Sequence, residues 1–298
     1  MVVTAQVGAE LRALSEAAPL DLRVNLLKGT RQEALAALRA AGFAAAPTPY
    51  SPIGIRLAQQ SGTIELGQLP GLLEVRARVR VRVRVRANPS PNPNPNPDQG
   101  RVEPQDEGSQ LIALLLGAQP GELVADYCAG AGGKTLALAA AMGNRGRLWA
   151  MDIDERRLAS GAPRCAKAGS LRTPDSGAHQ PLVATHSRVP TAQAGVDNVQ
   201  RHTIQAGKDQ WLKRRKRSFD RVLADAPCSG VGAWRRNPDA RWLRRTRPLD
   251  ELLPVQAQVL RRAATLARPG GTLVYATCSL LPDENERQVR MRHAALSA

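Results

Sequence analysis

The sequence predicts an α/β protein whose larger part is built on a parallel, doubly wound sheet. Three observations point to this class. From Glu107 onward, short runs rich in Val, Leu and Ala alternate with longer segments of helical periodicity. The first of these runs ends in a glycine-rich turn, which is where such a sheet approaches a ligand. A shorter α/β pattern fills residues 1–75 and predicts a smaller module in front of the sheet.

The small module is predicted to contain one helix between two strands. The helix runs from Thr30 to Ala41, because Thr30 is a preferred N-cap residue and Glu33 stands at the capping-box position. Gly42 follows and ends it. The two strands are expected at residues 19–25 and 52–58.

Residues 76–104 differ in composition from the rest of the chain. Six arginines alternate with Val or Ala over residues 76–86, and Asn-Pro repeats follow over 88–97. One interpretation is a strand whose arginines share one face and bind phosphate. The interpretation we favour is a low-complexity insertion, disordered in its Asn-Pro half because proline offers no amide hydrogen. Residues 161–191, rich in Ser, Pro and Thr, are expected to be a second insertion.

The larger part is predicted to be one domain over residues 105–298. The carboxyl ends of parallel strands lie along one edge of a sheet, so side chains that follow these strands are expected to share one crevice. The helices are expected at residues 109–118, 134–143, 155–168 and 249–267, and the strands at 122–129, 147–153, 199–204, 219–227 and 271–279.

The composition indicates a globular, strongly basic protein. Hydrophobic residues make up 43% of the chain, and 42 Lys and Arg against 26 Asp and Glu give a net charge of +16. This charge favours a polyanionic partner, of which nucleic acid is the commonest. Charge alone leaves open a merely soluble basic protein or a ribosome-associated one.

The cysteines and the lengths of the apolar runs predict the cellular compartment of the protein. The four cysteines are far apart and form no C-x-x-C pair, which argues against a zinc ribbon and against a disulfide framework. The first ten residues do not resemble a leader, and no apolar run reaches the roughly 18 residues of a membrane span. We therefore expect a soluble cytoplasmic protein, working as a monomer, with no metal and no membrane partner.

The glycine-rich turn after the first strand of the sheet matches neither of two common nucleotide-binding motifs. A P-loop would need glycine at Cys128, and a G-x-G-x-x-G fingerprint that begins at Gly130 would need glycine at Thr135. A tight turn between a strand and a helix remains, and it favours a nucleoside-type cofactor over a purely structural turn. Asp152 or Asp154, at the end of the next strand, could accept both ribose hydroxyls.

Two cysteines follow two other strands of the predicted sheet. Asp225-Ala-Pro-Cys228 ends one strand, and Thr277-Cys278-Ser279 ends another. A lone buried cysteine is most often a small core residue. Two cysteines at strand ends, each followed by serine and one preceded by Asp-Ala-Pro, favour chemistry in the crevice that holds the cofactor.

Methylation of carbon 5 of cytosine is a reaction that needs such residues. This carbon is too weak a nucleophile to take a methyl group from a sulfonium. A thiolate that adds at carbon 6 makes carbon 5 enamine-like, while a nearby acid neutralises ring nitrogen 3. A base then removes the carbon 5 proton and the thiolate leaves. One cysteine as nucleophile, an aspartate near nitrogen 3 and a second cysteine that assists release would meet these needs.

Five motifs relate the sequence to a known family. They are QDEGSQ (105–110), DYCAGAGGKT (126–135), DIDERRL (152–158), DAPCSGVGAWRRNPDARW (225–242) and YATCSLLPDENE (275–286). With these motifs the sequence resembles the Sun/Nop family of RNA cytosine-5 methyltransferases, in particular the bacterial ribosomal-RNA methyltransferase B group, over roughly residues 19–75 and 105–290.

The resemblance implies a Rossmann-like class I methyltransferase domain behind a small RNA-binding module, with S-adenosylmethionine as cofactor. It implies RNA as substrate, ribosomal RNA first and transfer RNA second. It makes Cys278 the nucleophile, Cys228 the residue that promotes product release, and Asp225 a contact of both cofactor and base. The cofactor residues that it implies are Cys128, Ala129, Gly130, Ala131, Gly132, Gly133, Lys134, Asp152, Asp209 and Asp225.

The chain departs from the family pattern in places, and two rival functions stay open. Ala131 stands where the family has proline, and the chain stops at Ala298, where the family would continue to a final helix and strand. These departures and the insertions favour, as a rival, a catalytically impaired RNA-binding or ribosome-assembly factor. A DNA cytosine methyltransferase would place its nucleophile at Cys228, and the additional Thr-Cys-Ser motif argues against it.

Basic and aromatic residues bracket the Asp225 motif and predict contacts to RNA. Arginines and lysines there suit phosphate, and tryptophans could stack on bases or pack in the core. The residues are Lys213, Arg214, Arg215, Lys216 and Arg217 before the motif, Arg235, Arg236, Arg241, Arg244, Arg245 and Arg247 after it, and Trp211, Trp234 and Trp242.

Overall fold

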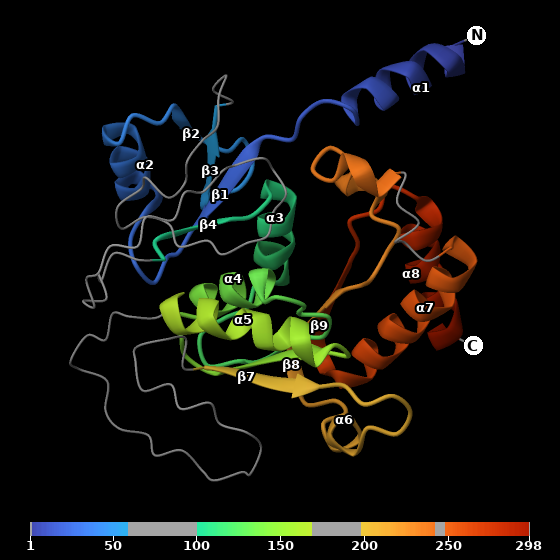
Figure 1. Cartoon of the computed structure of the whole chain (residues 1–298). Helices are drawn as coiled ribbons and strands as arrows, with labels where there is room; N and C mark the ends of the chain where they lie inside the picture. Colours follow the sequence, from blue (N-terminus) through green and yellow to red (C-terminus); the bar gives the residue numbers. More distant parts are fainter. Residues whose placement is uncertain (1, 59–99, 169–197, 242–247, 298) are drawn as a thin grey trace, which may run out of the picture.

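The computed structural model describes residues 2–58, 100–168, 198–241 and 248–297. They form two sheets with helices packed around them (Figure 1). The smaller sheet has the order β2-β3-β1-β4 and is antiparallel. A leading helix, α1 (Val2–Ala13), extends away from this module. The elements of the module are β1 (Leu20–Val24), α2 (Arg31–Ala40), β2 (Ala45–Pro47), β3 (Gly54–Leu57) and β4 (Val102–Pro104).

Local sequence determines the helix of this module. The Thr30 hydroxyl accepts a hydrogen bond from the Glu33 amide, and the Glu33 carboxylate accepts one from the Thr30 amide, so the predicted capping box is confirmed. One face of α2 then buries Leu35 and Leu38 against the sheet. The predicted strands at 19–25 and 52–58 are confirmed as β1 and β3.

The end of the predicted insertion differs in the structure. We expected the insertion to reach residue 104, but Val102–Pro104 forms β4, which pairs with β1 in the register Val24↔Val102 and Leu22↔Pro104. Val102 is 1% exposed and belongs to the core of the module. A three-residue strand has too little periodicity to be recognised in the sequence. The Val-Arg and Asn-Pro repeats, like residues 169–197, lie outside the described residues.

Two deletions test this boundary. Removal of residues 76–99 is expected to leave the melting temperature within about 2 °C, because closure entropy changes by only about 0.6 kcal/mol per doubling of loop length. Removal of residues 76–104 also takes away β4 and Val102, whose burial alone is worth about 1.5–3 kcal/mol. That variant is expected to melt at least about 5 °C lower. Equal melting temperatures in calorimetry would show that β4 is dispensable.

The larger sheet is parallel and has the order β7-β6-β5-β8-β9. The chain therefore reverses its direction of winding between β5 and β8, and the neighbouring carboxyl ends open a crevice at that point. The predicted doubly wound fold is confirmed. The strands are β5 (Leu123–Asp126), β6 (Arg147–Asp152), β7 (Val199–Thr203), β8 (Phe219–Asp225) and β9 (Ala267–Ala276).

Helices cover both faces of this sheet because side chains along each strand alternate between two cores. Val124 and Leu223 pack with α3 and α4, whereas Ala125 and Val222 pack with α6 and α7 on the other face. None of the helices in the described ranges is both long and apolar enough to cross a membrane. The helices are α3 (Glu107–Leu116), α4 (Gly133–Ala141), α5 (Glu155–Ala168), α6 (Gln210–Arg214), α7 (Leu249–Leu266) and α8 (Glu286–Ser297).

A polar junction joins the module to the larger sheet through the start of α3. Arg56 forms ion pairs with Asp21 at 2.7 Å and with Glu107 at 3.4 Å. The Glu107 carboxylate also accepts hydrogen bonds from the amides of Tyr50 and Ser51. Although burial raises the pKa of Glu107, these hydrogen bonds outweigh it and hold the pKa below its usual value. The QDEGSQ motif thus orients the module beside the crevice.

Candidate active site

The glycine-rich turn connects β5 to the first turn of α4. Gly130 (φ 53°) and Gly132 (φ 82°) adopt left-handed backbone conformations, which glycine reaches without strain. Asp152, at the end of β6, is 4% exposed and accepts a hydrogen bond from the Gly130 amide at 2.8 Å. Its other oxygen accepts the Asp154 amide at 2.9 Å. Asp152 therefore faces the turn, as a ribose-binding residue would need to.

Asp126 lies beneath this turn and was not among the residues that the sequence singled out. Its Oδ2 accepts a hydrogen bond from the Thr135 hydroxyl at 2.7 Å, and its Oδ1, buried, has no hydrogen-bond partner in the described part of the chain. Burial raises the pKa of Asp126 to about 7, against the lowering effect of Thr135. An acidic residue at the last position of the first strand is the signal that could have identified it. An unsatisfied buried acceptor suits a ligand with a donor group.

A cavity of ≈ 260 Å³ opens beside the turn. It brings together residues from both sheets, from α3 and from the turn. Five of the predicted cofactor residues line it, with four residues from the end of β4 to the first turn of α3 and with Asp126 and Arg236. The lining comprises Cys128, Ala129, Gly133, Lys134 and Asp225, together with Pro104, Gln105, Asp106, Ser109, Asp126 and Arg236.

Asp225 connects the cavity with the cysteine-bearing loops. It ends β8, and its Oδ2 accepts a hydrogen bond from Lys134 Nζ at 2.7 Å. Lys134 belongs to the first turn of α4 and also contacts the Ser109 hydroxyl at 3.4 Å. An ammonium group and a carboxylate therefore stand side by side at the switch point of the sheet.

The two cysteines that follow β8 and β9 meet at this edge. Sγ of Cys228 lies 3.1 Å from Sγ of Cys278, although the residues are 50 positions apart. Both are free thiols, and Cys278 is exposed. The hydrogen bond between the two thiols lowers the pKa of Cys278 to about 7, in opposition to burial, and raises the pKa of Cys228. The pair therefore comprises one thiolate-forming sulfur and one sulfur that keeps its proton.

Cys128 differs from this pair. Burial first, and then the nearby carboxylates Asp126, Asp152 and Asp225, raise its pKa well above the ordinary thiol value. A thiol that stays protonated is a poor nucleophile. Its place at the cavity is therefore that of a small lining residue.

Comparisons with known proteins agree with this geometry. A family model described as 16S rRNA methyltransferase RsmB/F matches residues 180–296, which include both cysteine motifs, and a model of the RsmF/B-like ferredoxin-like domain matches residues 5–63. Ribosomal RNA small subunit methyltransferase B of Salmonella newport is 33% identical over 280 residues, which are 94% of this chain and 52% of that protein. The chain belongs to the RsmB/F methyltransferase family. It spans about half the length of the curated relatives that it matches.

Solved structures show the same fold as this RsmB/F family member. A methyltransferase homolog protein from Pyrococcus horikoshii is 25% identical, with a TM-score of 0.63 over 95% of this chain and 72% of its own. NSun6 from Pyrococcus horikoshii, solved with SFG, is 20% identical, with a TM-score of 0.66 over 95% of this chain and 82% of its own. The predicted Rossmann-like methyltransferase fold is thereby confirmed.

Five of the cofactor residues that the resemblance to the family implied do not line the cavity: Gly130, Ala131, Gly132, Asp152 and Asp209. Asp209 caps α6 by accepting the Leu212 amide, and it also accepts the Gln205 amide and contacts His202 Nε2 at 2.9 Å. Burial raises the pKa of Asp209, but these hydrogen bonds outweigh it and leave the pKa lowered. The carboxylate thus already holds the loop after β7 in place.

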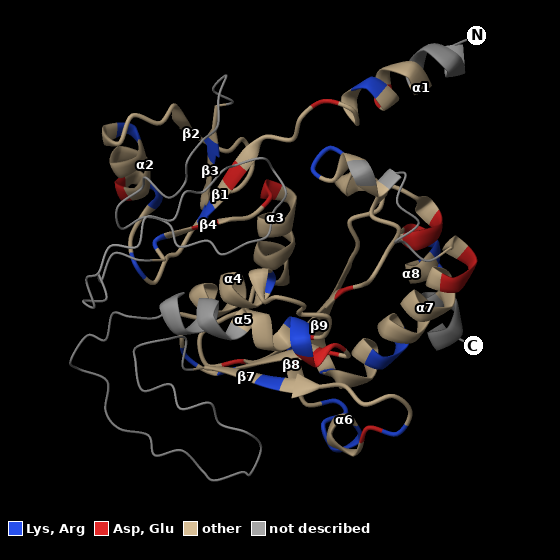
Figure 2. Cartoon of the chain, in the orientation of Figure 1, with Lys and Arg blue, Asp and Glu red and all other residues tan. Residues whose placement is uncertain are grey.

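Predicted RNA-binding side chains in this RsmB/F chain are in part engaged elsewhere. Arg235 donates to the carbonyls of residues 16 and 17, and Arg236 contacts Asp106 and the Pro19 carbonyl. Figure 2 shows this basic turn beside the segment that follows α1. Trp211 stacks on His202 with ring centroids 4.1 Å apart. Trp242, Arg244, Arg245 and Arg247 lie outside the described residues.

The basic run Lys213–Arg217 does not flank the crevice as expected. The Arg217 amide bonds to the Thr265 carbonyl directly before β8 begins, which places the end of the run at the amino edge of the sheet. Arg215 lies over the Trp211 ring, 3.9 Å from its centroid. The basic run is close to Asp225 in sequence, but the whole of β8 lies between them, so the end of the run and Asp225 are at opposite edges of the sheet.

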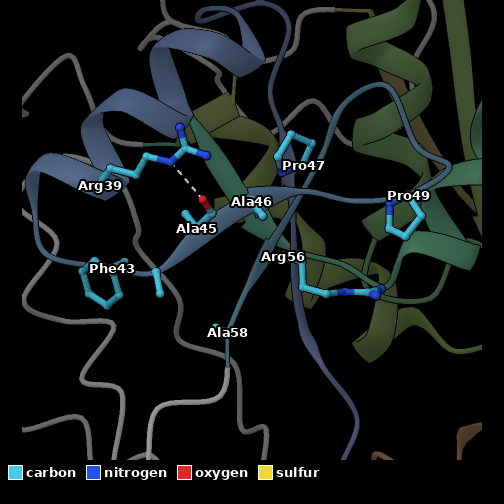
Figure 3. Close-up of a pocket in the computed structure, with 9 residues that line it drawn as sticks. Arg39, Phe43, Ala45, Ala46, Pro47, Pro49, Arg56 and Ala58 are labelled. Atoms are coloured by element: carbon cyan, nitrogen blue, oxygen red, sulfur yellow. Dashed lines mark hydrogen bonds between the residues drawn. The ribbon is translucent and has the colours of Figure 1, made fainter.

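The larger of the two cavities described here, ≈ 530 Å³, lies in the small module and away from the cysteines (Figure 3). Alanine and proline make up most of its lining, and Arg39 Nε donates to the Ala45 carbonyl at 2.9 Å. Arg56, at its border, is committed to Asp21. The charged groups Asp126, Lys134 and Asp225 line the smaller cavity and not this one.

Proposed function

We propose that the chain transfers a methyl group from S-adenosylmethionine to carbon 5 of cytosine in RNA, with ribosomal RNA of the small subunit as the substrate. One observation carries the proposal: two thiols 3.1 Å apart stand at the ends of neighbouring strands, on the edge that holds the glycine-rich turn. Covalent activation of the base needs a thiolate nucleophile, and its release is assisted by a second group within reach of the leaving sulfur. The relatives' names and the family membership support the same reaction.

The proposed steps follow from the two thiols and Asp225. The Cys278 thiolate adds to carbon 6 of the base, and the electron pair of the 5,6 double bond moves towards nitrogen 3, which takes the proton of a protonated Asp225 carboxyl group. S-adenosylmethionine, when bound, supplies the methyl group that carbon 5 then takes. Water takes the carbon 5 proton, which restores the double bond and expels Cys278 with Cys228 assisting release, and nitrogen 3 returns its proton to Asp225. The base must be single-stranded or flipped to reach these groups.

The residues at the turn fit the proposed cofactor. The left-handed glycines allow its close approach, Asp152 offers acceptors for ribose hydroxyls, and the unsatisfied Asp126 Oδ1 offers one for an ammonium group. A carboxylate has about four acceptor positions, so Asp152 can bind hydroxyls while it keeps its two backbone contacts.

Replacing Asp152 by alanine tests this assignment. The change removes charged acceptors and is expected to weaken S-adenosylmethionine binding by about 1.5–3 kcal/mol, which is about ten- to more than a hundredfold in Kd. Calorimetric titration measures it. Asp154→Ala is the matched control, because the Asp154 side chain accepts the amides of Arg156 and Arg157 at the start of α5. A larger loss in Asp154→Ala than in Asp152→Ala would transfer the ribose contact to Asp154.

The reaction itself is tested with RNA that carries tritium at carbon 5 of cytosine. Release of tritium that depends on S-adenosylmethionine and on the chain is the expected result, with one 5-methylcytosine formed per tritium released. RNA binding with neither release nor methylation would contradict the proposal and favour an assembly factor.

We further propose that the chain works as a monomer in the cytoplasm, where its free thiols stay reduced.

A further inference from the structure

A buried carboxylate lies between the two cysteine-bearing loops. Glu284 ends the short helix η4 (Pro282–Glu284) and is 0% exposed. It belongs to the motif at 275–286, but the reaction steps above give it no role. Its contacts, and those of the next residue, reach both cysteines' loops.

On one side Glu284 holds the loop of Cys228. Its carboxylate accepts hydrogen bonds from the Ser229 amide at 2.8 Å and from the Ser229 hydroxyl at 2.5 Å. Gln256 Nε2 donates both to Glu284 Oε1 at 2.8 Å and to the Pro227 carbonyl at 3.0 Å. The residue after Cys228 is thus bound to this carboxylate directly, and the residue before Cys228 is connected to it through Gln256.

On the other side Asn285 holds the loop of Cys278. Its Nδ2 donates to the carbonyls of Ser279 and Leu281, each at 3.0 Å, and its Oδ1 accepts the Thr277 hydroxyl at 2.6 Å. Glu284 and Asn285 are consecutive, so one peptide bond joins the residue that holds the Cys228 loop to the residue that holds the Cys278 loop.

We infer that Glu284 is a positioning residue that fixes Cys228 Sγ against Cys278 Sγ, and this inference rests on the proposed function of the two thiols. Burial raises the pKa of Glu284, but hydrogen bonds from Ser229, Ser279 and Gln256 outweigh it and keep the pKa below its usual value, so the side chain is ionised near neutral pH. Isolated burial of such a charge is unfavourable. The hydrogen bonds from Ser229 and Gln256, on the Cys228 side of the crevice, explain why it is tolerated here.

The matched pair Glu284→Gln and Glu286→Gln tests the inference in the full chain. Both change Glu to Gln, but Glu286 is exposed and two residues further on. In Glu284→Gln an amide group replaces an acceptor that faces donors, so the Cys228 loop is expected to move and Cys278 to lose its hydrogen bond. The rate of alkylation of Cys278 by iodoacetamide, mapped by mass spectrometry against pH, reports its thiolate fraction.

The pH midpoint of alkylation is expected to rise by at least about one unit in Glu284→Gln, so that Cys278 reacts about fivefold more slowly at pH 7. Glu286→Gln is expected to keep the wild-type midpoint. Besides Cys228, the groups that set this midpoint are Asp225, which raises the pKa of Cys278, and Lys134, which lowers it. Neither group is changed in these variants. If Glu284 only stabilises the fold and has no role in positioning, Glu284→Gln is expected to lower the melting temperature and leave the alkylation midpoint unchanged.

Ser229→Ala keeps the inference testable if Glu284→Gln does not fold. It removes the hydrogen bond from the Ser229 hydroxyl, and it is expected to shift the midpoint in the same direction by a smaller amount. An unchanged midpoint in folded Glu284→Gln, or in Ser229→Ala where Glu284→Gln does not fold, would overturn the inference. Alkylation needs neither RNA nor cofactor, so the two hypotheses can fail separately. A shifted midpoint in Glu284→Gln, together with absent methyl transfer by the wild-type chain, would contradict the proposed function and support the positioning role.

Discussion

Replacing Cys278 by alanine is expected to lower methyl transfer by at least about a thousandfold, because the covalent step is lost and the residual rate rests on binding alone. Affinity for S-adenosylmethionine is expected to stay within about twofold, since Cys278 does not line the cavity beside the glycine-rich turn. Tritium release measures the first effect and calorimetry the second. Capture of RNA containing 5-fluorocytosine on a denaturing gel is expected to vanish as well.

Cys165→Ala is a suitable control, because the proposed steps do not use that cysteine. It is expected to trap the fluorinated RNA as the wild type does. If Cys278→Ala still traps this RNA and Cys228→Ala does not, then Cys228 is the nucleophile, as in the DNA cytosine methyltransferases.

Replacing Cys228 by alanine is expected to have the opposite signature, with a covalent protein–RNA adduct that accumulates. The Cys228 thiol keeps its proton because its hydrogen bond to Cys278 raises its pKa, so it is placed to protonate or assist the sulfur that leaves. Without it, addition and methyl transfer proceed while release slows by about a hundredfold, the range of a lost general acid–base group. A shifted band on a denaturing gel, in the presence of S-adenosylmethionine, measures the adduct.

The double variant Cys228→Ala/Cys278→Ala separates this adduct from adventitious crosslinks. It is expected to give no shifted band, because the nucleophile is missing. Normal turnover of Cys228→Ala without any adduct would remove Cys228 from the mechanism. Turnover that is slow without an adduct would contradict a role in release.

Much of the fold could be predicted because its signals are local. The capping box of α2 involves residues three positions apart, and the nine-residue α4 follows directly from a glycine turn. Alternating strands and helices then restrict the sheet to a parallel arrangement. β4 was missed for the opposite reason, since the three residues Val102, Glu103 and Pro104 have no pattern of their own. The strand exists because β1, 78 positions away at Val24↔Val102, offers it a paired edge.

The candidate site could be predicted only as far as the edge of the sheet. Strand order places the ends of β5, β8 and β9 together, so both cysteine motifs and the glycine-rich turn could be assigned to one crevice. Strand order did not give the partners of Arg236, which contacts Asp106 and the Pro19 carbonyl, or of Asp209, which caps α6. Ionic and capping partners are chosen by proximity in space, and sequence spacing does not give that proximity.

The sequence by itself determined the class of sheet, the turn that receives a cofactor and the pair of cysteines with Asp225, because each depends on patterns a few residues long. Only the tertiary structure decided that the two sulfurs lie 3.1 Å apart and that they differ in their tendency to hold a proton. That difference needs a hydrogen bond between residues 50 positions apart, fixed by Glu284 and Asn285. Such a contact arises only when two strands and a buried carboxylate are packed together.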